Sequence, residues 1–295
     1  MNLLLLGGTR YMGLLLAEKL RVIRHFSNIY TLSKHPHPLN TPNHFVCDRK
    51  DVGALQSVIK QTRPNVIIDM INFAKDDSEG LVGIYESGIL SSVSHYIVIT
   101  SFVVYNHFEQ NKFKEKKVDI SQIDKELVDG YTKRKIEMEC SLYGSGIFDL
   151  TTIVRLPYVF SWDDYTGRFQ KLCELSKSSH RKFLNNVHKF SMISKLFAVD
   201  GLIDLSMNSP CGFVDLANNG CATTYEMAEI INSAYPKTAA DSASELEHPP
   251  YLVNKDLCIG TDKVALRENL SDALKREAKL YYQNQCSVSF NEHNV

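Results

Sequence analysis

The chain has 295 residues, with 33 Lys and Arg against 34 Asp and Glu, and 44% of the residues are hydrophobic. This balance is typical of a globular protein and excludes the disordered, collagen-like and membrane-spanning classes. The formal net charge of −1 provides no overall attraction to nucleic acid or anionic lipid, so we expect any anionic ligand to be held by local groups.

The first half of the chain alternates between short apolar runs and helical patterns. Residues 2–6 form an apolar run, a glycine turn follows, and apolar residues then recur at helical spacing from Leu14 to Ile23. Further predicted strands are 28–32, 45–47, 66–70, 96–100 and 150–154, and the predicted helices among them are 52–61, 79–92 and 133–142. This alternation predicts an α/β fold with a Rossmann-type, doubly wound parallel sheet.

After residue 160 the pattern loosens into mixed polar and aromatic sequence, which predicts a smaller C-terminal lobe. The elements expected there are a strand at 213–216 and helices at 225–233 and 269–282. We therefore divide the chain into a Rossmann domain, residues 1–160, and a second lobe, residues 161–295, some segments of which return to the first domain.

The seven cysteines are scattered and form no Cys-x-x-Cys pair. We interpret them as reduced thiols and expect a cytoplasmic protein, because disulfides are rare in that compartment. The first twenty residues do not resemble a signal peptide, since the segment 7–10 interrupts their apolar run. No metal site is expected, because His35, His37 and His44 lack an acidic or cysteine ligand at suitable spacing.

A glycine-rich turn directly follows the first predicted strand. Gly7, Gly8 and Gly13 carry no side chains, so backbone N–H groups at the start of the next helix can approach a pyrophosphate there. A plain tight turn between strand and helix is the alternative. The position of the turn after the first strand favours a dinucleotide cofactor, which makes residues 1–160 a dinucleotide-binding domain.

Three further residues could provide acid-base and hydrogen-bonding groups for a reaction. Tyr131 and Lys135 lie four residues apart and therefore on one face of a predicted helix. An ammonium group beside a phenol lowers the pKa of the phenol, which makes it a usable acid or base near neutral pH. Ser101 ends a strand at the carboxyl edge of the sheet, where such sheets bind ligands. Each feature is common by chance, but together they predict one catalytic site.

These residues resemble the extended short-chain dehydrogenase/reductases, also called the NAD-dependent epimerase/dehydratase family. The segment 6–13 resembles the cofactor fingerprint of the family. Ser101 lies four residues before Tyr105, as the active-site serine of the family does. Tyr131 and Lys135 resemble the catalytic pair of the family, so the resemblance implies that the catalytic residues are Ser101, Tyr131 and Lys135.

The resemblance also implies a cofactor site. Asp48 matches the aspartate that hydrogen-bonds the adenine, and the segment 155–160 matches the strand and proline turn that pass the nicotinamide. The implied cofactor-binding residues are Gly7, Thr9, Arg10, Tyr11, Met12, Gly13, Ser33, Lys34, Asp48, Asn72 and Pro157.

The end of the second predicted strand bears on the choice between NAD and NADP. Residues 30–35 contain no Asp or Glu, the residues that bind the ribose 2′-hydroxyl of NAD and repel a 2′-phosphate. Ser33 and Lys34 instead offer a donor and a cation, and Arg10 projects from the glycine turn toward the same place. We expect NADP to be favoured over NAD.

The family resemblance implies an NAD(P)-dependent nucleotide-sugar epimerase or 4-ketoreductase that uses hydride transfer. Tyr131 would move a proton to or from a sugar hydroxyl, Ser101 would hold the same oxygen, and Lys135 would bind the nicotinamide ribose. The C-terminal lobe would bind the substrate. A homodimer that pairs through the helices at 79–92 and 133–142 is also implied.

Within the family, the segments 7–10, 66–73 and 164–168 are most similar to an atypical branch that includes plastid stem-loop RNA-binding proteins. The alternative function is therefore a cofactor-binding scaffold that binds RNA or a protein. We do not expect RNA to be the partner, because RNA binding needs a basic surface, whereas the net charge is −1 and the longest basic run is 112–117.

The chain departs from the family pattern at several positions. Arg10 occupies the middle glycine position of the fingerprint, and Asn106 and Ser161 stand where glycines usually follow the serine strand and the proline turn. Asp163 and Asp164 are expected to form a solvated turn, and Trp162, the single tryptophan, is expected to pack in the lobe.

Overall fold

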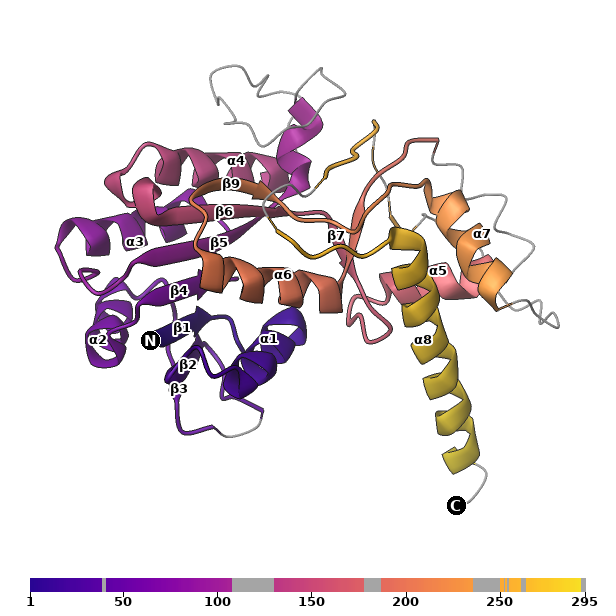
Figure 1. The fold of residues 1–295 in the computed structure, drawn as a ribbon, viewed down its shortest axis with the longest axis horizontal. Helices are drawn as coiled ribbons and strands as arrows, with labels where there is room; N and C mark the ends of the chain where they lie inside the picture. Colours follow the sequence, from indigo (N-terminus) through magenta and orange to yellow (C-terminus); the bar gives the residue numbers. More distant parts are fainter. Residues whose placement is uncertain are drawn as a thin grey trace.

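A computed structural model of the chain describes residues 1–38, 41–107, 130–177, 187–235, 250, 251, 253, 255–260 and 264–292. Seven parallel strands form one sheet in the order β3-β2-β1-β4-β5-β6-β9, and β7 pairs with β8 beside it (Figure 1). The strands are β1 (Asn2–Leu6), β2 (Asn28–Ser33), β3 (His44–Val46), β4 (Val66–Asp69), β5 (His95–Ser101), β6 (Thr151–Leu156), β7 (Tyr158–Phe160), β8 (Met192–Ser194) and β9 (Gly212–Asp215).

Helices connect these strands. They are α1 (Tyr11–Val22), α2 (Val52–Thr62), α3 (Lys75–Glu86), α4 (Gly130–Tyr143), α5 (Arg168–Ser176), α6 (Lys195–Asn208), α7 (Thr224–Ala234) and α8 (Leu270–Glu292), with 3₁₀ helices η1 (Phe102–His107) and η3 (Gly146–Leu150). The predicted doubly wound parallel sheet is confirmed. Its strand order reverses between β1 and β4, so the carboxyl ends of these two strands border the crevice where such sheets bind ligands.

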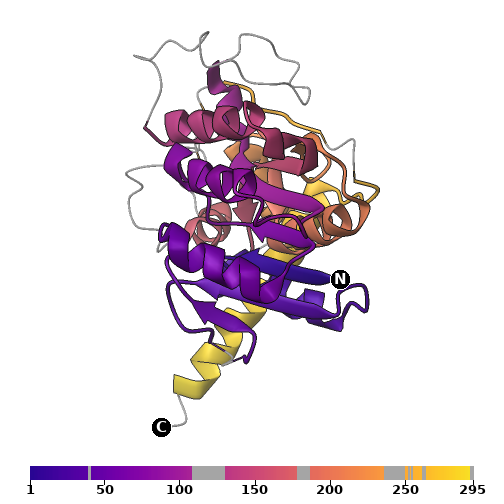
Figure 2. The same ribbon diagram turned by 90° about the vertical axis from the view of Figure 1, so that its left-hand side faces the viewer.

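The sheet is buried on both faces, as its nearly continuous apolar strands require. One face packs against α1 and α6, where Leu16 and Leu202 contact strand residues such as Leu5. The other packs against α2, α3 and α4, where Leu55 and Leu81 contact the opposite strand face (Figure 2). The β2, β3 and α2 edge of the sheet therefore lies on one side of the crevice, and β5, β6 and α4 lie on the other.

A separate apolar cluster lies beyond the carboxyl end of the sheet. Helices α5, α7 and α8 contribute Phe169, Met227 and Leu274 to it, and Phe160 at the end of β7 joins them. Figure 1 shows these helices beside the sheet, with the end of α8 extending away from the rest of the chain. By contrast, β9 and α6 belong to the second half of the sequence but pack with the main sheet.

Three helices differ from the sequence-based prediction. Helix α3 starts at Lys75 rather than at residue 79, because the Asp77 carboxylate accepts hydrogen bonds from the Phe73 and Ala74 backbone N–H groups and caps the helix there. Helix α8 continues to Glu292, ten residues past its predicted end at 282. Helix α6 was not predicted. Its apolar residues face both α1 and the sheet, so the sequence shows no one-sided helical pattern.

The expectation that all seven cysteines are reduced thiols is wrong. Cys221 and Cys258 form a disulfide, with their Cα atoms 5.7 Å apart and a sequence separation of 37. Phe190 pairs with both Ala222 and Leu257, which brings the two cysteines together through long-range contacts. The predicted cytoplasmic location remains a prediction.

Helices α3 and α4, through which a homodimer is predicted, lie next to each other on one face of the sheet (Figure 1). The homodimer remains a prediction. In the parts of the chain that the structure describes, none of the helices combines the length and the apolar character needed to cross a bilayer.

Candidate functional site

The glycine turn after β1 packs more tightly than any other residue type would allow. Gly7 has a φ of 99°, and a Cβ atom at Gly8 would lie 2.8 Å from Thr31 Cγ2. A Cβ atom at Gly13 would overlap the carbonyl oxygen of Gly7. Helix α1 therefore begins close against the turn, and the unpaired backbone N–H groups of a helix N-terminus suit an anion.

A cavity of about 380 Å³ opens beside this turn. Six of the predicted cofactor-binding residues line it, which are Gly7, Thr9, Arg10, Ser33, Lys34 and Asp48. Lys34 Nζ lies 2.8 Å from Asp48 Oδ2, and the hydrogen bond from Lys34 holds the pKa of Asp48 below its usual value. His35 and Lys50 also line the cavity, so several basic groups surround its opening.

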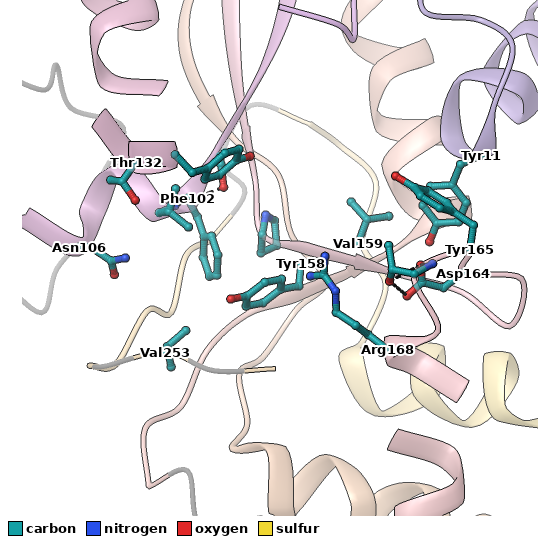
Figure 3. Close-up of a pocket in the computed structure, with 15 residues that line it drawn as sticks. Tyr11, Phe102, Asn106, Thr132, Tyr158, Val159, Asp164, Tyr165, Arg168 and Val253 are labelled. Carbon is teal, nitrogen blue, oxygen red and sulfur yellow. Dashed lines mark hydrogen bonds between the residues drawn. The ribbon is translucent and has the colours of Figure 1, made fainter. Parts of the chain in front are cut away.

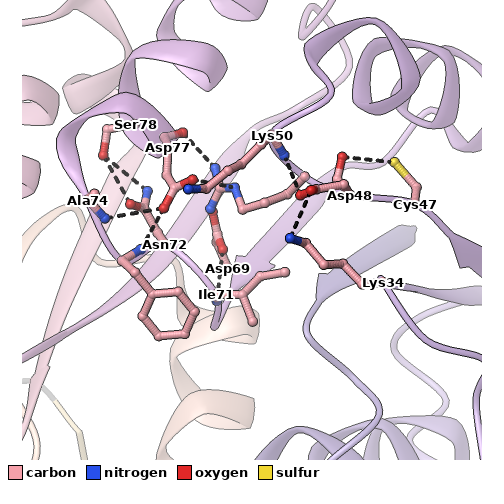
Figure 4. Close-up of polar contacts among 12 residues, drawn as sticks. Lys34, Cys47, Asp48, Lys50, Asp69, Ile71, Asn72, Ala74, Asp77 and Ser78 are labelled. Carbon is pink, nitrogen blue, oxygen red and sulfur yellow. Dashed lines mark hydrogen bonds and ion pairs between the residues drawn. The ribbon is translucent and has the colours of Figure 1, made fainter.

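A buried ionic network supports the floor of this cavity (Figure 4). Arg49 Nη1 donates to Asp69 Oδ2 at 2.6 Å, and Arg49 Nη2 donates to the Asp77 carbonyl oxygen at 2.6 Å. Tyr96 donates to the same Asp69 oxygen at 3.0 Å. Sequence reasoning missed Arg49, although it is the residue after Asp48 in a segment that matches the family.

A larger cavity of about 890 Å³ lies at the carboxyl ends of β5 and β6 (Figure 3). Ser101 at the end of β5 and Tyr131 in the first turn of α4 both line it. Pro157, between β6 and β7, lines it as well. The Tyr131 side chain is 46% exposed, so the residue is open to a ligand in the cavity.

Lys135 lies one helical turn after Tyr131 and is buried, with 4% of its surface exposed. Its Nζ donates to the Asn72 carbonyl oxygen at 2.8 Å and lies 5.9 Å from the centre of the Tyr131 ring. Burial lowers the pKa of Lys135 to about 8, while the nearby carboxylates of Asp69 and Glu139 act in the opposite direction. Lys135 Nζ also lies 5.2 Å from the centre of the Phe73 ring, which lines the smaller cavity, so the ammonium group lies between the two cavities. With a pKa of about 8 it is still mostly protonated at pH 7.

Solved structures share this fold over nearly the whole chain. A dTDP-glucose 4,6-dehydratase from Bacillus anthracis, solved in complex with NAD, is 14% identical and matches over 97% of each chain with a TM-score of 0.69. The chain has the fold of the extended short-chain dehydrogenase/reductases. This confirms, at the level of the fold, the resemblance inferred from the sequence.

Two other structures with this short-chain dehydrogenase/reductase fold carry different activities. UDP-glucose 4-epimerase from Thermotoga maritima, solved with UDP-glucose, is 13% identical over 97% of this chain and 100% of its own, with a TM-score of 0.67. A dTDP-4-dehydrorhamnose reductase from Yersinia enterocolitica is 13% identical over 95% of this chain and 99% of its own, with a TM-score of 0.66. No protein-family model matches the sequence, and no curated protein matches it.

Four of the predicted cofactor-binding side chains are not among those that line the smaller cavity, and one of them, Pro157, lines the larger cavity. The Asn72 side chain is fully buried and donates to Ser78 and Tyr96, so that only its carbonyl group meets Lys135. Met12 packs in the core between α1 and the sheet. The Tyr11 side chain lines the larger cavity.

The far wall of the larger cavity comes from the turn between β7 and α5, together with Tyr158 on β7 (Figure 3). Asp164 is buried rather than solvated, and it accepts hydrogen bonds from the Thr166 backbone N–H at 3.0 Å and hydroxyl at 2.8 Å. Arg168 begins α5, with its guanidinium 5.8 Å from the centre of the Tyr158 ring. The segment 164–168 matches the atypical branch, and this match is the sequence signal that could have identified the wall.

The structure also shows where the residues that depart from the family pattern lie. Asn106 lines the larger cavity, and its buried side-chain oxygen has no hydrogen-bond partner among the residues that the structure describes. Ser161 is fully buried beside Tyr11. Trp162 packs against the apolar cluster that helices α5, α7 and α8 form, as predicted. Among the residues that the structure describes, no group of His, Cys, Asp and Glu side chains could hold a metal ion.

Proposed function

We propose that the protein is an NAD(P)-dependent enzyme that acts on a nucleotide-sugar, as a 4-epimerase or a 4-ketoreductase. One observation carries the proposal. Ser101 and Tyr131 line the same cavity at the carboxyl edge of the sheet, and the buried ammonium of Lys135 lies one turn from Tyr131. A hydroxyl, a phenol and an ammonium in this arrangement provide acid-base groups for an alcohol that is oxidised or a ketone that is reduced.

In this proposal each of the three residues has its own role. The Tyr131 phenol takes the proton from a sugar hydroxyl, or returns it to a sugar ketone, and Ser101 holds the same oxygen by a hydrogen bond. The Lys135 ammonium favours the phenolate electrostatically and binds the hydroxyls of the nicotinamide ribose. Its place between the two cavities suits both tasks.

The residues of the smaller cavity fit a nicotinamide dinucleotide. The close approach of Gly13 to Gly7 leaves backbone N–H groups clear for a pyrophosphate, and Asp48, which the resemblance assigns to the adenine, lines the same cavity. A nicotinamide cofactor, when bound, supplies the carbon that accepts or returns the hydride. Thr9 and Arg10 would lie along the pyrophosphate, beside the turn that positions it.

We further propose that NADP is the preferred cofactor. Arg10, Lys34 and Lys50 line the mouth of the smaller cavity, where a 2′-phosphate would find charge-assisted hydrogen bonds. Asp48, the acidic residue nearest to Lys34, is already paired with it at 2.8 Å. Its negative charge is therefore partly compensated and opposes a 2′-phosphate less than a free carboxylate would.

An elimination of water from the sugar is less well supported. Elimination needs one group that takes a carbon-bound proton and another that protonates the departing hydroxyl. The two residues after Ser101 are Phe102 and Val103, which are apolar. Among the described residues that line the larger cavity, the one carboxylate is Asp164, and Thr166 holds it. The site therefore favours epimerisation or ketone reduction over dehydration.

The test of this proposal is mass spectrometry of small molecules released from the purified full-length protein. We expect NADP or NAD together with a uridine or thymidine diphosphate sugar. Tyr131→Phe, which removes one oxygen, is the matched control and should retain the cofactor. If the wild-type protein releases no nicotinamide nucleotide and does not bind NADP or NAD in calorimetry, the proposal is wrong.

The alternative is a cofactor-binding scaffold that binds RNA or a protein. It would retain the cofactor but would convert no nucleotide-sugar, and RNA fragments would co-purify in its RNA-binding form. The basic run 112–117, on which RNA binding would depend, lies outside the residues that the structure describes. Nuclease-treated and untreated preparations, compared by their ultraviolet absorbance ratio, separate the two functions.

A further inference from the structure

Tyr11 belongs to the glycine turn by sequence, but its side chain faces the other cavity. Thr9 and Arg10 line the smaller cavity, whereas Tyr11, the next residue, lines the larger one. Figure 3 shows the Tyr11 ring beside Tyr165 at one end of the larger cavity. Three consecutive residues therefore connect the proposed cofactor site with the proposed substrate site.

The backbone of Tyr11 has a φ of 47°, in the left-handed region that L-residues with side chains seldom adopt. Tyr11 is also the first residue of α1. A residue in this conformation depends on its surroundings to hold it there. The contacts of the Tyr11 side chain therefore help to hold the backbone conformation of the turn that would bind the pyrophosphate.

The hydrogen bond of the Tyr11 side chain and its aromatic and cation–π contacts are made with residues of the second half of the chain. Tyr11 packs edge to face against Tyr165, with 5.5 Å between the ring centres, and Lys195 Nζ lies 5.2 Å from the centre of the Tyr11 ring. The Tyr11 hydroxyl lies 3.0 Å from Ser161 Oγ. Asp163 accepts a hydrogen bond from Ser161 at 2.6 Å and forms an ion pair with Lys195.

The direction of the bond between Tyr11 and Ser161 follows from proton counting. A serine hydroxyl has one proton, and the short distance to the Asp163 carboxylate indicates that the proton points there. Ser161 therefore accepts, and Tyr11 donates. Burial raises the pKa of the Tyr11 phenol, so the donor proton is kept at neutral pH. A glycine at position 161, as the family pattern has, could not accept this bond.

We propose that Tyr11 and Ser161 are positioning residues that transmit binding of the cofactor at the glycine turn to the segment 161–165, which borders the larger cavity. This inference rests on the proposed function, since it requires a dinucleotide on the turn. A pyrophosphate on the backbone N–H groups of the turn fixes the backbone at Tyr11. The phenol then holds Ser161 and Tyr165 in the arrangement that receives the substrate, which makes substrate affinity dependent on the cofactor.

The single tryptophan provides the test, because Trp162 follows Ser161 directly and is partly buried. Titration of NADP⁺ into the full-length protein should change the Trp162 emission, with a midpoint equal to the calorimetric Kd. Tyr11→Phe keeps the ring and removes the hydroxyl. We expect it to bind NADP⁺ within about threefold of the wild type and to lose at least half of the emission change. Ser161→Ala should behave in the same way.

Tyr143→Phe, a tyrosine on α4 that lines neither cavity, is the matched control and should keep the full response. Circular dichroism would show that each variant is folded. An unchanged response in both Tyr11→Phe and Ser161→Ala would overturn the inference, as would a wild-type protein that binds NADP⁺ without any change in emission. Failure of NADP⁺ and NAD⁺ to bind at all would overturn the proposed function and this inference with it.

Discussion

Glu139 and Arg155 form a buried ion pair, with 2.7 Å between Glu139 Oε2 and Arg155 Nη2, that joins α4 to β6. Both side chains are nearly inaccessible to solvent, and the Arg155 guanidinium also donates to the Tyr105 hydroxyl at 2.6 Å. Tyr131, Lys135 and Glu139 are spaced four residues apart on α4 and therefore share one helix face. The ion pair thus holds the face of the helix that carries the proposed acid-base residues.

We expect Glu139→Gln to lower the free energy of unfolding by about 3–5 kcal/mol, because it leaves the Arg155 charge buried without its carboxylate. Urea denaturation followed by circular dichroism measures this loss. Glu137→Gln on the same helix is the control, since Glu137 pairs with Lys133 at 4.0 Å on the surface and should contribute less than about 1 kcal/mol. Equal losses in the two variants would show that the buried pair has no special role.

Tyr131→Phe should lower turnover by about 10²- to 10⁴-fold and leave cofactor affinity nearly unchanged, because it removes the acid-base oxygen and little else. Turnover is measured with the nucleotide-sugar identified by mass spectrometry, and cofactor affinity by calorimetry. Tyr143→Phe, at the last residue of α4, should retain wild-type turnover. Normal turnover by the Tyr131→Phe variant would mean that another group moves the proton.

The lowered pKa of Lys135, about 8, predicts a pH-dependent cofactor affinity. Lys135 is charged below pH 8 and neutral above it, so the affinity for NADP⁺ should fall as the pH rises through about 8. Calorimetry at several pH values measures this change, and Lys135→Arg, which keeps its charge, should move the fall to higher pH. A wild-type affinity that stays constant between pH 7 and pH 9 would contradict the assignment.

The same pKa has a consequence for stability. Between about pH 8 and the unfolded value of about 10.4, the unfolded chain keeps a proton on Lys135 that the folded chain has lost. The contribution of Lys135 to the free energy of unfolding therefore rises with pH across this window. In Lys135→Met the rise should be absent, which urea denaturation at pH 8 and pH 10 would show.

For the smaller cavity we expect Arg10→Ala combined with Lys34→Ala to reduce the preference for NADP⁺ over NAD⁺ by about tenfold or more, since two charge-assisted contacts to a 2′-phosphate are lost. Calorimetric titrations of both cofactors are compared at one salt concentration, because salt screens exposed charges. Lys60→Ala, an exposed lysine near the end of α2, controls for net charge. A ratio that does not change in the double variant would exclude these residues as the 2′-phosphate site.

The disulfide between Cys221 and Cys258 closes a long loop that contains α7. Cys221→Ser should lower the free energy of unfolding by about 3–4 kcal/mol, because the unfolded chain gains the freedom that the cross-link removed. Cys211→Ser, at an exposed cysteine outside the disulfide, should change it by less than about 0.5 kcal/mol. Mass spectrometry of peptides from the unreduced protein checks the pairing, and two free thiols at these positions would contradict it.

The features that could be predicted from the amino-acid sequence are those that depend on residues close together in the chain. Apolar runs such as residues 2–6 predict buried parallel strands, and their alternation with helical patterns predicts the doubly wound sheet. The glycine turn and the shared helix face of Tyr131 and Lys135 were also predictable from the sequence. Backbone geometry over a few residues fixes which groups share a turn or a helix face.

Features that depend on packing between distant segments could not be predicted and required the three-dimensional structure. Local sequence does not show that the Tyr11 side chain turns away from the smaller cavity toward Ser161, 150 residues later. It also does not show that Arg49 is buried against Asp69, or that Cys221 reaches Cys258. The burial and partner of a side chain are set by whichever segments the fold brings against it. The order of neighbouring residues in the sequence therefore does not specify these long-range contacts.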